Sequence, residues 1–167
     1  LKVLEEPPSN TYFILINNDR FILPTLKSRC INFKISFDHK TSISVINKIL
    51  DDDIMKFINK DLINYYLTPG QIYHLIEFFK IQKHDLKDYD LKRFLKLVIK
   101  DNLYKKNTLI KDIIFEYFEF YFRTKIKLAK SSTFEYYDYF LKRINDTKKF
   151  NLDEESLFIE FEYKILN

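Results

Sequence analysis

The chain has 167 residues, of which 46% are hydrophobic and 31% are charged, a balance typical of proteins that fold around a core and not of disordered chains. No apolar run approaches the roughly 20 residues of a membrane-spanning helix, and no basic-then-apolar leader is present, so we expect a cytoplasmic protein without a membrane partner. The net charge is only +4, with acidic residues interleaved among the lysines, whereas nucleic-acid-binding domains usually concentrate their basic residues on one face.

The first 36 residues combine β-type and helical signals. Two successive prolines at positions 7 and 8 end an initial helical segment, because the residue before a proline avoids the helical conformation. Residues 11–16 are β-branched and aromatic without alternation, which predicts a strand buried on both faces. A short helical segment then ends at Ser28, and residues 30–35 predict a second, shorter strand.

After residue 36 the apolar spacing becomes helical. Asp38 or Thr41 can cap a first helix that ends before a run of three aspartates, and a second helix is expected to end near Leu67. Thr68 can cap a third helix, with Pro69 at its first position. The residues expected to face inward are Ile43, Ile46, Ile49 and Leu50 in the first helix, Ile58, Leu62, Ile63 and Tyr66 in the second, and Ile72, Leu75, Ile76 and Phe79 in the third.

A polar, lysine-rich stretch at residues 82–89 is interpreted as a linker. Four further helices are predicted after it, at residues 91–101, 109–130, 134–145 and 153–166. We therefore predict a mostly α fold in three parts, with boundaries near residues 36 and 82.

The segment 110–122 is apolar on nearly every helical face. A helix of this kind should be buried on several faces. It is either the central helix of a monomeric bundle or a helix that contacts another subunit, since the cores of interfaces favour aromatic side chains.

Few residues offer chemistry. The one cysteine, Cys30, allows neither an internal disulfide nor a cysteine-rich zinc site, and we interpret it as a small, buried apolar residue of the second strand. The three histidines lack metal-ligand spacing, so no metal site is expected. A single glycine cannot build a phosphate-binding G-x-x-x-x-G-K-[ST] loop, so no nucleotide-binding residues are expected either.

Arg29 is the strongest candidate for function. It stands where the short helical segment meets the second predicted strand, so two elements would hold its backbone while the guanidinium points outward. A planar fork with five donors suits a phosphate oxygen on a neighbouring molecule. A surface arginine that merely caps a helix end is the alternative interpretation.

The surrounding motifs resemble the bacterial clamp-loader ATPase family of DNA polymerase III. The order L-E-E-P-P at residues 4–8, an apolar strand, a polar residue, a short helix and then Ser28-Arg29-Cys30 is similar to that family. The resemblance is dense over residues 1–35, weaker to about residue 80, and thin beyond. It implies the C-terminal part of an AAA+ α/β core at residues 1–36, a three-helix lid at 37–82 and a helical collar for oligomerisation at 83–167.

The resemblance also assigns roles to residues. Arg29, in the S-R-C signature with Ser28 and Cys30, would be an arginine finger that acts in trans on a neighbouring subunit. Asn17 falls where the family places its sensor-1 residue. Gln71 stands near the position at which ATP-hydrolysing subunits carry a sensor-2 arginine, and a neutral amide cannot replace that cation. This pattern resembles the non-hydrolysing delta-prime type.

The resemblance implies that ATP and magnesium are bound by the neighbouring subunit and that this chain alone has no ATPase or polymerase activity. The implied partners are the gamma/tau and delta subunits and, indirectly, the sliding clamp and primed DNA. Two alternatives remain open at this point. One is an N-terminally truncated gamma/tau subunit that hydrolyses ATP when intact. The other is a helical nucleic-acid-binding module that uses the C-terminal bundle.

Overall fold

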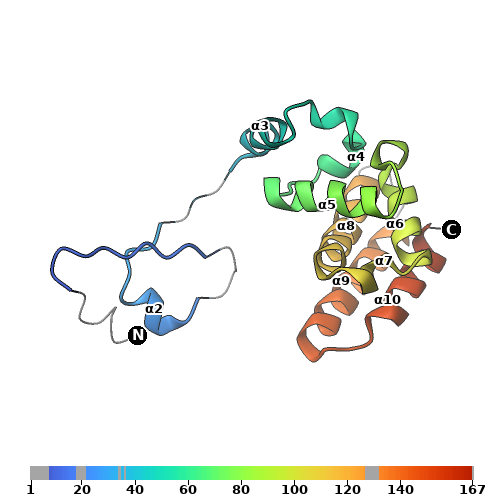
Figure 1. Ribbon diagram of the computed structural model, residues 1–167. Coiled ribbons are helices and arrows are strands. Elements are labelled where there is room, and N and C mark those ends of the chain that lie inside the picture. Colours follow the sequence, from blue (N-terminus) through green and yellow to red (C-terminus); the bar gives the residue numbers. More distant parts are fainter. Residues whose placement is uncertain (1–7, 18–21, 34, 36, 127–131, 167) are drawn as a thin grey trace. The chain divides into compact units, whose positions relative to one another are not determined.

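The computed structural model describes residues 8–17, 22–33, 35, 37–126 and 132–166 (Figure 1). It separates the chain into two compact units, Leu1–Ser36 and Phe37–Asn167. The residues that are described form mostly helices, as the sequence predicts. No helix in the described ranges is long and apolar enough to cross a membrane.

The first unit contains the helix α2, Pro24–Lys27. Proline favours this position because its fixed φ suits a helix start and its missing N–H has no partner there. The helix ends at Ser28, as predicted, and the Ser28 backbone N–H donates to the carbonyl of Pro24 at 3.0 Å. The predicted end of an initial helix, before the two prolines, lies outside the described residues.

The prediction of two strands in this unit is wrong for the residues that the structure describes. Neither 11–16 nor the described part of 30–35 is in a strand, and Tyr12, Ile14, Ile31 and Phe33 are each more than 80% exposed. Strand backbones need a neighbour that accepts and donates their hydrogen bonds. Within the described residues these two apolar stretches have no such neighbour, so their β-type composition alone does not make a sheet.

The second unit is helical throughout its ordered elements. In chain order these are α3 His39–Leu50, the 3₁₀ turn η1 Ile54–Lys56, α4 Lys60–Ile63, α5 Pro69–Ile81, the 3₁₀ turn η2 Leu86–Asp88, α6 Leu91–Lys100, α7 Leu103–Lys106, α8 Thr108–Ile126, α9 Ser132–Phe150, α10 Glu154–Phe161 and the π-helical turn η3 Glu162–Leu166.

The first and third helices expected after residue 36 are confirmed, and the second is shorter than expected. Asp38 caps α3 by accepting a hydrogen bond from the Thr41 N–H, although Ile49, expected inside, is 55% exposed. In place of a long second helix, the chain makes η1 and the four-residue α4. The reason is local: the Asn59 side chain accepts from the Asp61 N–H and so starts a new helical turn.

The later helices also follow the sequence pattern, with corrected ends. α6 matches its prediction to within a residue, whereas α9 continues to Phe150, five residues beyond its expected end at 145. The one-turn helix α7 was not predicted. It begins after Asn102, which adopts a left-handed conformation with φ of 51° and turns the chain between α6 and α8.

Helix α8 lies at the centre of this unit (Figure 1). Its apolar sequence was consistent with a central helix of a bundle or with a helix that contacts another subunit. The structure supports a central helix, because its side chains pack against α6, α9 and α10 of the same chain. Phe118 stacks on Phe161 with ring centroids 3.7 Å apart, and Phe122 contacts Phe140 at 5.8 Å. Its buried members are Ile110, Ile113, Ile114, Phe115, Tyr117, Phe118, Tyr121 and Phe122.

The same helix also connects the two regions predicted as lid and collar. The buried hydroxyl of Tyr117 in α8 donates a hydrogen bond to the carbonyl of Leu62 in α4. Phe79 of α5 contacts Phe94 of α6, with ring centroids 5.3 Å apart. The described residues of the second unit therefore share one hydrophobic core.

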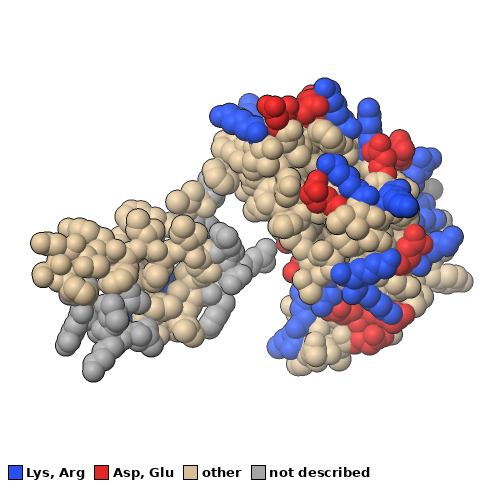
Figure 2. Space-filling model, in the orientation of Figure 1, with Lys and Arg blue, Asp and Glu red and all other residues tan. Residues whose placement is uncertain are grey.

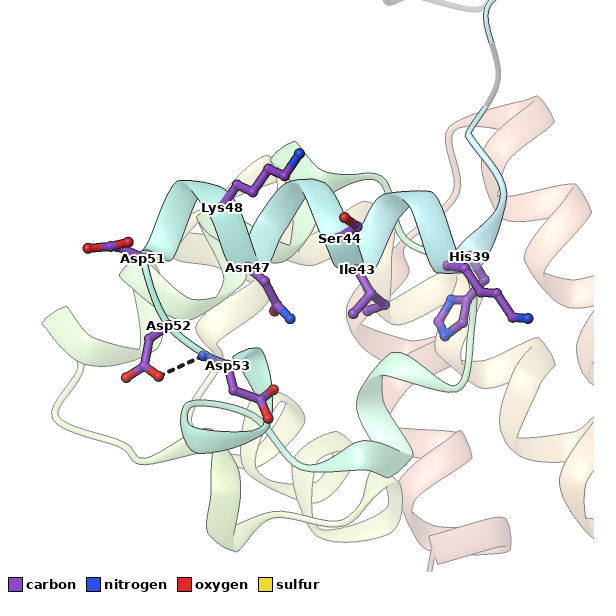
Figure 3. Close-up of a pocket in the computed structure, with 9 residues that line it drawn as sticks. His39, Ile43, Ser44, Asn47, Lys48, Asp51, Asp52 and Asp53 are labelled. Atoms are coloured by element: carbon purple, nitrogen blue, oxygen red, sulfur yellow. Dashed lines mark hydrogen bonds between the residues drawn. The ribbon is translucent and has the colours of Figure 1, made fainter.

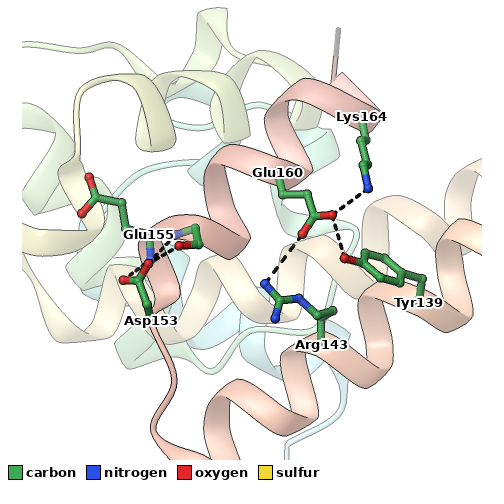
Figure 4. Close-up of polar contacts among 7 residues, drawn as sticks. Tyr139, Arg143, Asp153, Glu155, Glu160 and Lys164 are labelled. Atoms are coloured by element: carbon green, nitrogen blue, oxygen red, sulfur yellow. Dashed lines mark hydrogen bonds and ion pairs between the residues drawn. The ribbon is translucent and has the colours of Figure 1, made fainter.

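A polar cluster joins α9 to the C-terminal helices (Figure 4). Glu160 accepts hydrogen bonds from the Tyr139 hydroxyl and the Lys164 ammonium, both at 2.7 Å, and Arg143 approaches its other oxygen at 3.7 Å. Burial by itself raises the pKa of Glu160, but the hydrogen bonds from Lys164 and Tyr139 outweigh it and hold the pKa below its usual value. The ionised carboxylate is thus the stable form in the folded chain.

We expect Tyr117→Phe to destabilise the chain by about 1–3 kcal/mol, because it leaves the buried Leu62 carbonyl without its donor. Burial raises the pKa of Tyr117 far above its usual value, so the hydroxyl remains a donor at all ordinary pH values. Urea denaturation followed by circular dichroism measures the change. Tyr73→Phe, at an exposed tyrosine of α5, is the control; equal stability of the two variants would contradict the prediction.

We expect Glu160→Gln to lower stability near neutral pH by about 1 kcal/mol. Because the folded-state pKa of Glu160 lies below its unfolded value, its stabilisation is present above the unfolded pKa and disappears as the pH falls through the folded pKa. The difference in stability between wild type and variant should therefore disappear in acid. Urea denaturation midpoints over a series of pH values measure it. Glu162→Gln, on η3 and outside this polar cluster, is the control and should leave the urea midpoint at neutral pH near that of wild type.

Candidate functional site

The Ser28-Arg29-Cys30 corner is a folded turn at the end of α2. Its centre is the carbonyl of Thr25, which accepts one hydrogen bond from the Ser28 hydroxyl at 3.2 Å and another from Nη1 of Arg29 at 2.8 Å. The last carbonyls of a helix lack partners within the helix. Both side chains of the signature thus satisfy the helix end from which they extend.

A second set of hydrogen bonds closes the turn from the other side. The amide of Asn32 donates to the carbonyls of Lys27 at 3.1 Å and Cys30 at 3.0 Å, and the Arg29 N–H donates to the Leu26 carbonyl at 3.1 Å. Thr25 and Asn32 are therefore positioning residues that the sequence analysis missed. A clue was available, since asparagine side chains often bond to nearby backbone in turns.

Arg29 is exposed at this corner. A guanidinium carries five N–H donors in one plane and can bind a carboxylate or phosphate through two of them. The bond to Thr25 is also the one that a helix-capping arginine makes. The geometry is thus compatible with both interpretations of Arg29, whose exposed side chain bonds the Thr25 carbonyl through its own guanidinium.

The other candidates of the first unit lie in irregular backbone. Asn17 is exposed at the end of the described stretch 8–17, not at the tip of a strand. Cys30 is half-buried and is not in a strand, contrary to our expectation of a buried strand residue. Both corrections have the same cause, because the strands that were to place these side chains are not formed.

Gln71, in the second unit, has a clear structural role. It is the third residue of α5, where its side-chain oxygen accepts from the Thr68 N–H at 2.9 Å while its own N–H donates to the Thr68 hydroxyl at 3.3 Å. This reciprocal pair is a capping box, which satisfies two N–H groups at the helix start. A glutamine at this position is therefore explained by helix capping alone.

A large open concavity of about 760 Å³ lies against α3 and the three aspartates that follow it (Figure 3). None of the candidate residues lines it. Asp52 accepts from the Asp53 N–H at 2.7 Å and pairs with Lys56, while Asp53 accepts from the Met55 N–H. These carboxylates close the loop, and no group of side chains in the described residues could hold a metal ion.

We expect Gln71→Arg to lower stability by about 0.5–1 kcal/mol, because arginine has no acceptor to receive the Thr68 N–H. Gln71→Glu is the matched control, since a glutamate restores the same box. Thermal denaturation of both variants measures the effect. If the arginine variant were as stable as wild type, the capping box would not account for this glutamine.

The comparisons with known proteins agree with the motifs of the first unit. A family model described as "DNA polymerase III, delta subunit" matches residues 1–39. The DNA polymerase III subunit delta' of Buchnera aphidicola subsp. Schizaphis graminum is 28% identical over 162 residues, which cover 87% of this chain and 48% of that protein. The subunit delta' of Buchnera aphidicola subsp. Baizongia pistaciae is 62% identical over 32 residues, 19% of this chain and 10% of that protein.

The chain spans about half the length of the first of these relatives. No solved structure gave a significant match. The family model and both relatives are DNA polymerase III subunits, as the resemblance of the S-R-C and L-E-E-P-P motifs implies. By these matches, the chain is similar to the delta' subunits of DNA polymerase III.

Proposed function

We propose that this chain is part of a clamp-loader subunit that supplies Arg29 in trans to ATP bound by a neighbouring subunit during DNA replication. Arg29 would place its guanidinium on the γ-phosphate. There it would stabilise the negative charge that develops as the bond between the γ-phosphorus and the departing ADP breaks. Ser28 and Cys30 flank it, and Ser28 shares the Thr25 carbonyl with Arg29.

The observation that carries this proposal is the exposed Arg29 within a motif that lies inside the family match. Hydrogen bonds among residues 25–32 hold its corner, so the side chain starts from a defined backbone. A finger needs such an anchor, because ordering a long side chain at the moment of reaction costs conformational entropy.

In this proposal the nucleotide and its magnesium ion belong to the neighbour, a gamma/tau-type subunit in the bacterial cytoplasm. The delta subunit would complete the ring, and the sliding clamp and primed DNA would be reached through the assembly. The neutral Gln71 supports the non-hydrolysing delta-prime type over a truncated gamma/tau subunit, because it stands near the position where the family resemblance places an arginine in ATP-hydrolysing subunits.

The charge distribution gives little support to the other alternative, a nucleic-acid-binding bundle. The chain carries 28 lysines and arginines against 24 aspartates and glutamates, and on the one face of the second unit that Figure 2 shows the two kinds are interspersed. Long-range attraction to a phosphate backbone needs clustered charge of one sign.

The test is DNA-stimulated ATPase activity of a clamp loader reconstituted with the full-length subunit. We expect Arg29→Ala to lower the rate on the order of 10³-fold, as fingers do in other phosphoryl-transfer systems, while the complex still assembles. Arg29→Lys should also lower the ATPase rate, because a lysine ammonium cannot bind a phosphate through two parallel N–H donors as a guanidinium does.

Lys27→Ala is the matched control, since Lys27 is an exposed cation on the same short helix. It should leave the rate unchanged, with assembly checked by light scattering. A normal rate for Arg29→Ala in an intact complex would refute the trans role and leave Arg29 as a helix-capping residue.

A further inference from the structure

A basic concavity of about 320 Å³ lies in the second unit, where η1, α5 and η2 meet. Its floor is apolar, formed by Phe57 with the buried Ile76 and Leu86. Lys56, Lys80, Lys83, His84 and Asp85 complete the lining. Three lysines and one carboxylate line the concavity, and Asp52 and Glu77, outside the lining, pair with two of the lysines. The volume is that of a small-molecule site.

Lys83 occupies an unfavourable backbone position. Its φ is 61°, in the left-handed region that favours glycine and tolerates asparagine and aspartate. The other non-glycine residues with positive φ in the described chain are Asn10, Asp51, Asn102 and Asn151. Lys83 is thus the exception among them, and it is the one whose side chain lines a cationic concavity.

The left-handed conformation at Lys83 is imposed by the end of α5. The Lys83 N–H donates to the Lys80 carbonyl and the His84 N–H donates to the Phe79 carbonyl, both at 3.0 Å. This pair of bonds is a Schellman motif, which ordinarily carries glycine at this position. The helix end needs the left-handed conformation but does not need a lysine, and a lysine in this conformation is more strained than a glycine. We therefore look to the lysine side chain for the reason that this residue stands here.

The lining cations are available to an anion. Lys56 and Lys80 pair with Asp52 and Glu77, at 2.7 and 2.9 Å, but these are exposed pairs of little strength in water. Among the ion pairs between described residues, none involves Lys83. The one carboxylate in the lining, Asp85, accepts a hydrogen bond from the Lys87 N–H, which directs one of its oxygens to η2.

We propose that this concavity, lined by Lys56, Lys80 and Lys83, binds a phosphate group. Three ammonium groups can surround a phosphate with charge-assisted hydrogen bonds. The phosphate belongs either to a free anion such as pyrophosphate or to a nucleic-acid backbone. The site is independent of Arg29, since it lies entirely in the second unit.

The test is isothermal titration of the full chain with sodium pyrophosphate and, separately, with a short single-stranded oligodeoxynucleotide. We expect Lys83→Asn to weaken binding about tenfold, the loss of one charge-assisted hydrogen bond. The same variant should melt at a higher temperature than wild type, because asparagine tolerates the left-handed conformation. Weaker binding in a more stable protein cannot be attributed to unfolding.

Lys100→Asn, at an exposed lysine of α6 outside the concavity, is the matched control and should bind as wild type does. Binding of pyrophosphate alone identifies a free anion, whereas oligonucleotide binding with the same dependence on Lys83 identifies a nucleic-acid backbone. Either result supports a phosphate site. No binding of either probe, or binding that Lys83→Asn leaves unchanged, would overturn it.

Discussion

The burial of α8 on nearly all of its faces is the constraint on which the second unit depends. A helix this rich in aromatic side chains is stable in water only if other helices cover it, and α6, α9 and α10 do so. The stacked rings of Phe118 and Phe161 are the closest aromatic pair among the described residues. The Tyr117 hydroxyl is buried in this core together with its partner, because it donates to the Leu62 carbonyl.

The first unit is organised in a different way. It has no comparable core in its described residues, and its apolar side chains around residues 12–16 are exposed. The Arg29 corner is ordered by hydrogen bonds between residues that are near one another in the sequence, from Thr25 to Asn32. Local bonds of this kind need no sheet, which explains why the corner is formed although the strands on either side are not.

An element could be predicted from the sequence when the residues that stabilise it lie close together in the chain. Capping residues such as Asp38 and Thr68 were identified because their partners lie three residues away. The inward residues of α5 followed from helical periodicity, and all four are buried. The strands failed because strand formation depends on a distant partner. The strained lysine at position 83 carries no pattern in the sequence, since positive φ at a lysine arises only from the completed helix end.

The bond between Tyr117 and Leu62 also has a mechanical consequence. It joins α8 to α4 inside a shared core, so the two regions on either side of residue 82 cannot rotate against each other without exposing a buried carbonyl. Such a rotation would also separate the rings of Phe79 and Phe94, so a buried hydrogen bond and an aromatic contact both oppose it.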